Sequence, residues 1–286
     1  MISIIITAFK EANTIGKAIE SIQNNNLKDY EILVICPDDE TRDVALKFKN
    51  IKYFKDPGKG KPSALNLAFK TAKGDILVLT DGDVFVDNNS INNLLKQFEN
   101  DNVGAISGHP MSINSKNNMF GFWAYLLTNV AHDLRSKGNN FVCSGYLMAI
   151  RQGLIESIPE NSLVDDAVIS NLILDKGLSI AYAPEAIVSV KYPNNFNDWI
   201  KQKIRSSGGY YQLKEFTKSN TKMKRSFLSE SSGVFSIFKY ITNFKEFLFT
   251  LALILARFYL WFRIFYDIKI RRKDFSKIWK RIESTK

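Results

Sequence analysis

The sequence predicts an α/β fold in which a mostly parallel sheet is flanked by helices and followed by a C-terminal helical segment. Three observations lead to this fold class. Strand-length apolar runs alternate with helical apolar patterns through the first hundred residues of the 286-residue chain. These runs are apolar throughout, as expected for the strands of a parallel sheet covered on both faces. One long apolar stretch, 244–268, lies near the end of the chain.

The N-terminal elements follow in a regular order. The first strand is expected at 2–7, and behind it Ile15, Ala18, Ile19 and Ile22 repeat at helical spacing. The alternation then continues with a strand at 31–36, a helix at 41–49, a strand at 51–54, a helix opened by Pro62 and a strand at 75–80. Such sheets bind ligands at the carboxyl ends of their strands, so the polar residues after each strand are the first to consider.

The second stretch of the chain is more mixed. Its expected elements are a helix at 91–98, a strand at 103–107, a helix at 119–134, a strand at 141–150, a helix at 165–176, strands at 178–183 and 186–192, and a helix from 197 to about 216. Gly177 suits the C′ position of the helix before it. Neither an internal repeat nor a low-complexity linker interrupts this region.

Chain length and cysteine content bound the organisation of the protein. The length allows one large domain and an appendage, so we expect a domain over 1–217 and a basic, apolar helical segment over 218–286. The two cysteines, Cys36 and Cys143, lie in apolar runs and predict neither a disulfide framework nor a zinc site. The first residues do not resemble a signal peptide, which predicts that the body of the protein lies in the cytoplasm.

The formal net charge of +10 calls for an anionic partner. Basic residues gather on either side of the apolar stretch, at Lys218, Lys222, Lys224 and Arg225 and again at Lys269, Arg271, Arg272, Lys273, Lys277, Lys280 and Arg281. Basic clusters that bracket an apolar segment are typical of attachment to anionic lipid headgroups. We therefore predict anionic membrane lipids as a partner and no nucleic acid.

Two carboxylates follow the strand at 75–80. Asp81 and Asp83 are separated only by Gly82, at the strand end where a ligand would bind. Oxygen ligands of this kind suit a hard divalent cation, which can bridge the phosphates of a nucleotide diphosphate and stabilise it as a leaving group. Because aspartate and glycine are also common in turns, a plain solvated turn is the alternative for this motif alone.

A basic loop precedes the helix opened by Pro62. Lys59 and Lys61 flank Gly60 at the helix N-terminus, where free N–H groups and the helix dipole attract phosphate. An ordinary helix start with exposed lysines is the alternative. With the acidic turn, this loop predicts a site for a phosphorylated ligand.

Together these stretches resemble family 2 glycosyltransferases, which have a GT-A-type fold and use nucleotide-sugar donors. Residues 4–11, IIITAFKE, look like the opening strand and nucleotide loop of that family, usually written I-I-P-A-Y-N-E. The resemblance implies nucleotide-sugar contacts at Thr7, Ala8 and Glu11, although Thr7 is itself a departure from the pattern. Asp38 falls in the acidic loop that contacts the base or ribose.

The resemblance extends through the basic loop and the acidic turn. Residues 59–66 are similar to the family's G-K-x-x-A-L-N segment, with Lys61 as a donor contact, and residues 81–83 to its D-x-D motif. By this resemblance Asp83 is the chief metal ligand. Asp81 is a second metal or ribose contact, and the cofactor is Mn²⁺ or Mg²⁺.

Three further segments resemble the acceptor half of the family. Residues 143–145 look like the small-residue segment beneath the acceptor, and Asp165 and Asp166 look like its acidic pair. Gln202 and Arg205 match the start of the Q-x-x-R-W motif of membrane polysaccharide synthases and imply contacts to the donor diphosphate. Ser206 replaces the tryptophan of that motif, which weakens a prediction of processive synthesis and leaves single-sugar transfer untouched.

The resemblance implies an inverting glycosyltransferase that is dependent on a divalent metal. Asp166 is the expected general base, and Asp165 orients it. Helix capping is the alternative use of both aspartates. The donor is a nucleotide-diphosphate sugar, with UDP-sugars favoured over GDP-sugars, and residues 1–217 form the catalytic domain. A sugar nucleotidyltransferase and an inactive membrane scaffold on a transferase fold are the competing interpretations.

The C-terminal apolar stretch predicts attachment to the membrane. It is about long enough to cross a bilayer core, which needs ~20 apolar residues. Arg257 near its centre and Arg263 favour a helix that lies in the interface or pairs with another helix, and the mode of insertion stays open. A core helix packed on the catalytic domain is the alternative. We expect action at the cytoplasmic face of the cell membrane on a lipid-linked or glycan acceptor.

Overall fold

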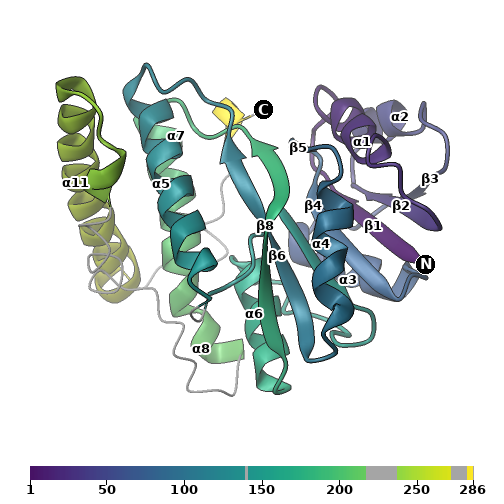
Figure 1. The fold of residues 1–286 in the computed structure, drawn as a ribbon. Helices are drawn as coiled ribbons and strands as arrows, with labels where there is room; N and C mark the ends of the chain where they lie inside the picture. The colour runs from purple at the N-terminus through teal and green to yellow at the C-terminus, as the bar shows by residue number, and fades with distance from the viewer. Residues whose placement is uncertain (139–140, 217–236, 272–281, 286) are drawn as a thin grey trace.

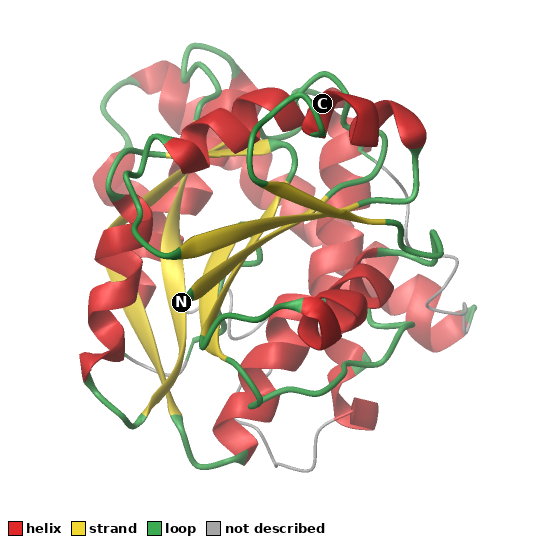
Figure 2. Cartoon of the chain, turned by 90° about the vertical axis from the view of Figure 1, so that its right-hand side faces the viewer, coloured by secondary structure: helices red, strands yellow, loops and turns green. Residues whose placement is uncertain are grey.

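The computed structural model describes residues 1–286 except 139–140, 217–236, 272–281 and 286. Its centre is an eight-stranded sheet with the order β3-β2-β1-β4-β7-β6-β8-β5. Helices cover both faces of this sheet, which twists strongly along its length (Figure 2). The predicted α/β class, with a mostly parallel N-terminal half and helices on both faces of the sheet, is confirmed.

The N-terminal half alternates strand and helix as expected. Its elements are β1 (Ile2–Thr7), α1 (Ile15–Gln23), β2 (Tyr30–Ile35), α2 (Asp39–Ala45), β3 (Ile51–Phe54), α3 (Lys61–Thr71) and β4 (Ile76–Asp81). All four strands run parallel, and β1 lies between β2 and β4. Their carboxyl ends therefore meet along one edge of the sheet.

The second half differs from the expectation in four strands, and the strand expected at 103–107 continues to Ser112. Its elements are β5 (Val84–Val86), α4 (Ser90–Leu95), β6 (Val103–Ser112), α5 (Met119–Ser136), β7 (Leu147–Arg151), α6 (Asp165–Asp175), β8 (Ser179–Val190), α7 (Phe196–Gly208), α8 (Leu213–Phe216) and α11 (Phe244–Phe265). β5 was not expected, and the two strands expected over 178–192 form the single strand β8. The strand expected at 141–150 begins only at Leu147, so residues 143–146 are free to form a loop at the site.

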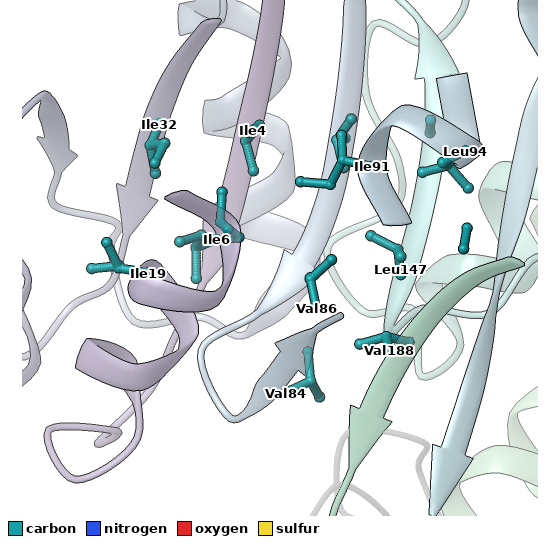
Figure 3. Packing of buried hydrophobic residues seen from close by; sticks show 14 of the residues in the cluster. Ile4, Ile6, Ile19, Ile32, Val84, Val86, Ile91, Leu94, Leu147 and Val188 are labelled. Atoms are coloured by element: carbon teal, nitrogen blue, oxygen red, sulfur yellow. The ribbon is translucent and has the colours of Figure 1, made fainter. Parts of the chain in front are cut away.

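The apolar strands have side chains buried on both faces of the sheet. Ile4 and Ile6 of β1 pack with Ile19 of α1 on one face, in the cluster shown in Figure 3. Ile5 points to the other face and packs with Leu65 of α3 in a second cluster that also includes residues of α6. Burial on both faces explains why the sequence of β1 shows no alternation of polar and apolar residues.

A third apolar cluster joins the C-terminal helix to the rest of the fold. Helix α11 lies beside α5 and α7, on the opposite side of the molecule from α1 and α2 (Figure 1). The rings of Trp123 and Trp199 meet at 5.2 Å within this cluster, and both residues are buried. The indole N–H of Trp123 also donates to the carbonyl of Phe249 at 2.7 Å. Both tryptophans therefore pack in the core of the fold.

Candidate active site

The acidic turn and the first loop are joined at the carboxyl ends of β1 and β4. Thr7 is paired with Asp81 in the parallel register, and its hydroxyl donates to Asp81 Oδ1 at 3.1 Å. The backbone N–H of Gly82 donates to the carbonyl of Thr7 at 3.0 Å. Two neighbouring strands thus hold the start of the D-G-D turn at the edge where parallel sheets bind ligands.

Glycine at position 82 is required by the closeness of the first loop. A Cβ atom added there would lie 2.4 Å from Glu11 Oε2 and 2.9 Å from Ala8 Cβ. The turn that carries Asp81 and Asp83 therefore packs directly against the two residues predicted to contact the nucleotide. The structure brings these sequence-predicted residues together in one corner of the fold.

Lys61 links three segments of the site that are far apart in the sequence. It is the first residue of α3 and follows Gly60, whose φ of 106° favours glycine. Its ammonium lies 2.7 Å from Asp81 Oδ1 and 3.4 Å from Asp165 Oδ2 and donates to the carbonyl of Gly145 at 3.2 Å. Burial disfavours the charge, but the carboxylates of Asp165 and Asp81 outweigh it and raise the pKa of Lys61. Lys61 is therefore positively charged at neutral pH.

The two aspartates of the acidic pair have different surroundings. Both lie in the first turn of α6, and Asp166 accepts backbone N–H groups from Gly145 at 3.2 Å and from Ala167 at 2.8 Å. Burial raises the pKa of Asp166, as does the neighbouring charge of Asp165, whereas Lys61 opposes the rise. A carboxylate with a raised pKa that is held in a fixed position suits a general base.

Tyr146 is a member of the site that the sequence did not reveal. Burial raises the pKa of its phenol, and Arg205 opposes this rise. The carboxylates of Asp83, Asp81 and Asp166 act in the same direction as burial. Arg205 and the three carboxylates therefore all lie close enough to Tyr146 to affect the pKa of its phenol. The only sequence signal for it was its position, directly after the small-residue segment.

The predicted nucleotide loops are tied to each other by Asp38. Its carboxylate caps α2 by accepting from the N–H and hydroxyl of Thr41, at 3.0 and 2.6 Å, and also accepts the N–H of Lys10 at 2.8 Å. Burial works against its charge, but these hydrogen bonds lower the pKa of Asp38. The N–H of Glu11 completes the connection by donating to the Thr41 hydroxyl at 2.8 Å. Asp38 thus shapes the loop around the expected nucleotide position.

Gln202 and Arg205 lie three residues apart on α7 but have different neighbours. The charge of Arg205 opposes the rise in the pKa of Tyr146, so Arg205 lies on the part of α7 that is near this ring. Gln202 lines a small, shallow hollow between α5 and α7, whose wall includes Tyr192 and Trp199. Its Oε1 atom is buried and accepts no hydrogen bond within the described part of the chain.

Asp81 and Asp83 are the carboxylates of the expected cation site. Among the residues that the structure describes, no three Asp, Glu, His or Cys side chains are grouped to hold a metal by themselves. Asp81 and Asp83 offer two carboxylates, and Mg²⁺ and Mn²⁺ sites of this type take their remaining oxygens from water and substrate phosphates. The residues fit a cation that binds together with a diphosphate.

Comparison with known sequences gives consistent matches. The sequence model of glycosyl transferase family 2 matches residues 3–158. The chain is 25% identical to the probable glycosyltransferase YdaM of Bacillus subtilis, over 94% of this chain and 68% of that protein. It is 26% identical to hyaluronan synthase of Streptococcus pyogenes, over 65% of this chain but only 43% of the synthase. The chain therefore spans less than half of that enzyme's length.

Solved structures extend the likeness across the C-terminal part. The mannosyltransferase PcManGT from Pyrobaculum calidifontis, solved in complex with GDP-Man and Mn²⁺, superimposes with a TM-score of 0.64 at 17% identity. That match covers 96% of this chain and 88% of the other. TarS of S. aureus matches with a TM-score of 0.52 at 14% identity, over 82% of this chain and 78% of the TarS chain. At these identities the likeness is one of fold.

Proposed function

The chain belongs to glycosyl transferase family 2 and is a glycosyltransferase; from this premise we propose that it transfers one sugar, with inversion, from a nucleotide-diphosphate sugar. Family membership favours this reaction over the nucleotidyltransferase and the inactive scaffold considered from the sequence. The proposed donor site runs from Thr7, Ala8 and Glu11, past Asp38, to the acidic turn at the end of β4.

Asp83 and Asp81 would hold the divalent cation, Mn²⁺ or Mg²⁺. When bound, the cation would neutralise the donor diphosphate and make it a better leaving group. The Mn²⁺ and GDP-Man in the mannosyltransferase neighbour support this assignment. Lys61 would bind phosphate oxygens from the helix N-terminus, and Arg205 would contact them from α7. Gln202 lies one turn before Arg205 on α7, and we propose that it joins Arg205 at the diphosphate, as the sequence predicts.

Asp166 is the proposed general base. The acceptor hydroxyl oxygen attacks the anomeric carbon as the bond from that carbon to the diphosphate oxygen breaks. The hydroxyl proton passes to Asp166, and the nucleotide diphosphate leaves with the electron pair. Direct displacement inverts the anomeric centre, and Asp165 would keep Asp166 in position and maintain its raised pKa.

One observation carries this proposal. The ammonium of Lys61 contacts both Asp81 of the acidic turn and Asp165 of the acidic pair, and it also reaches the carbonyl of Gly145. The segments expected to bind the donor and to activate the acceptor therefore meet around one side chain. A transfer reaction needs the two substrates next to each other at such a point.

Further aspects of the proposal concern the acceptor. We propose a lipid-linked or glycan acceptor, reached at the cytoplasmic face of the membrane. Within the described residues one helix, Phe244–Phe265, is long and apolar enough to cross a bilayer, with a mean hydropathy of 1.7. The likeness to hyaluronan synthase also supports action on a growing glycan, whereas Ser206 in place of tryptophan supports addition of a single sugar.

The decisive experiment is a calorimetric donor titration of the detergent-solubilised protein. UDP- and GDP-sugars are added with manganese, with magnesium or with a chelator. We expect metal-dependent binding of one nucleotide family, UDP-sugars by our prediction. Binding that is indifferent to the chelator would contradict the metal assignment.

The substitution Asp83→Asn tests the assignment of Asp83 as a metal ligand, because it replaces one carboxylate oxygen by an amide nitrogen. It should lower turnover at least about 10²-fold, because one charged contact to the cation is lost. Asp87→Asn is the matched control, since Asp87 is exposed and its carboxylate accepts the hydroxyl of Ser189 at 3.1 Å. Equal activity of the two variants would exclude Asp83 as a metal ligand.

A further inference from the structure

Helix α11 has an inner face that is packed on the catalytic domain along its whole length. Near its start, Lys245 Nζ donates to the carbonyl of Asn117 at 3.0 Å, and Phe249 O accepts the indole N–H of Trp123. Further along, Leu253, Leu260 and Ile264 are at most 1% exposed, in the cluster shared with α5 and α7. The helix is therefore fixed to the domain from one end to the other.

The outer face of α11 is also apolar, and it is open. We call the following residues the outer face: Phe244, Phe247, Leu248, Leu251, Leu255, Phe258, Tyr259, Phe262 and Phe265. Each is between 37% and 73% exposed. Successive residues of a helix are turned by about 100° around its axis. Viewed down that axis, all nine side chains therefore lie within about 80° of Leu255. Such a continuous apolar stripe on a surface marks an interaction site.

Charged residues of α11 lie off this face. In the sequence, Arg257 is evidence against a spanning helix. This residue is half-buried and lies about 160° around the helix axis from Leu255, on the side that faces the domain. Glu246 is half-buried there too and accepts from Thr242. Lys245 and Arg263 lie at the edges of the stripe, about 80° from its centre, where Lys245 donates to the carbonyl of Asn117 and Arg263 pairs with Asp267.

The packing of the inner face is incompatible with a spanning helix. If α11 crossed a bilayer, α5 and α7 would have to enter the hydrocarbon core beside it. These helices carry Asp133 and Asp198, which pair with Lys239 and Lys201. Charged groups at that depth are strongly unfavourable. A helix that lies in the plane of the membrane keeps α5 and α7 in water.

We propose that the outer face of α11 docks in the plane of one leaflet of an anionic bilayer. The proposal rests on the proposed action at a membrane and specifies how the contact is made. Two features favour a lipid surface over a second copy of the chain. The net charge is +10, and the residues that follow α11 in sequence include eight further cations, Lys269, Arg271, Arg272, Lys273, Lys277, Lys280, Arg281 and Lys286. Six of the nine outer-face side chains are aromatic, as is common where a helix meets headgroups and acyl chains.

Vesicle flotation of the full-length protein tests the docking. Vesicles of phosphatidylcholine with phosphatidylglycerol should bind the protein, and pure phosphatidylcholine should bind it more weakly. Leu255→Glu should reduce binding at least about tenfold, because burial of an exposed leucine is lost and a charge is added. Leu46→Glu is the matched control: Leu46 is 51% exposed but follows α2 on the opposite side of the molecule, so binding should not change. Equal binding of the two variants would overturn the proposal.

Spin labels measure the orientation of the helix. Cysteines placed at Leu248, Leu255 and Phe262 lie on the outer face over about 21 Å of helix axis. The native Cys36 and Cys143 are fully buried, so they do not compete for the label. In-plane docking predicts the same shallow depth at all three positions, about 5–10 Å below the headgroups. A steady change of depth from 248 to 262 indicates a spanning helix and overturns the proposal.

Two further readouts separate this inference from the proposed enzyme function. Leu255→Glu should keep wild-type donor hydrolysis in detergent, because Leu255 lies outside the active site. Vesicle binding without any donor binding would refute the transferase site and leave the docking intact. A protein that forms stable dimers through α11, lost in Leu255→Glu, and ignores vesicles would overturn the docking while the donor site stands.

Discussion

Lys61 shows at the level of single residues what the sequence could and could not predict. The loop of residues 59–66 predicted a cation near phosphate, and the structure puts Lys61 at the helix N-terminus as expected. Its contacts to Asp165 and to the carbonyl of Gly145 could not be predicted, because they join residues about a hundred positions apart. Tyr146 escaped notice for the same reason, since a lone tyrosine after a strand-like run carries no motif.

The pH dependence of catalysis follows from the charges around Asp166. Burial and the charge of Asp165 raise its pKa, and Lys61 lowers it. A general base must be deprotonated, so activity is lost as pH falls through this pKa. The acid limb of kcat/KM should therefore lie above the value of about 3.9 typical of an exposed aspartate.

Two substitutions should move this limb in opposite directions. Asp165→Asn removes a like charge, so it should lower the pKa of Asp166 and shift the limb to lower pH. Lys61→Met removes an opposite charge and should shift it to higher pH. The measurement is kcat/KM for the donor between pH 4 and 9 in each variant. Shifts in the same direction would show that Asp166 is not the titrating base.

At the level of elements, the parallel half of the sheet was predictable and the second half less so. The strands β1, β2, β3 and β4 are short apolar runs between helices with clear periodicity. β5 has only three residues, too few for a periodic signal. The run 141–150 contains a strand only from Leu147, because Gly145 and Tyr146 are used by the active-site loop, where tertiary contacts override local propensity.

The turn between β4 and β5 depends on glycine at position 82. Gly82→Ala should lower the free energy of unfolding by about 1–3 kcal/mol, because the new methyl group would overlap Glu11 and Ala8. It should also weaken donor binding by displacing the carboxylates on either side. Gly16→Ala in α1 is the control, since its methyl group meets only ordinary contacts at 3.5 Å and longer. Urea unfolding and donor calorimetry measure the two effects, and equal results for both variants would contradict this account of the turn.

For the whole molecule, the prediction that 1–217 forms the catalytic domain and 218–286 an appended segment stays a prediction. Helix α11 nevertheless covers apolar side chains of α5 and α7, among them Phe122, Trp123 and Trp199. The sequence marked α11 as apolar but could not tell its inner face from its outer one, because both are apolar. Only the packing partners separate the two.

A chain that ends at residue 217 should therefore be poorly soluble. Without α11, the cluster around Trp123 and Trp199 is exposed to water, and such a patch promotes aggregation. A chain that ends at residue 271 keeps α11 and serves as the control. Dye binding to exposed apolar surface and size-exclusion chromatography in detergent-free buffer compare the two. A monomeric, dye-silent 1–217 fragment would show that α11 is dispensable for the fold.

The attachment of α11 to α7 has a consequence for the choice of acceptor. The same helix, α7, packs with α11 in the cluster that contains Trp199, and it carries Arg205, whose charge acts on Tyr146 of the active site. Once the outer face of α11 is docked on a leaflet, the packing of α11 against the catalytic domain fixes the distance from the membrane surface to Asp166, the proposed general base. Among acceptors anchored in that leaflet, the enzyme then selects those whose free hydroxyl lies at one fixed distance from the membrane surface, whatever sugar carries that hydroxyl.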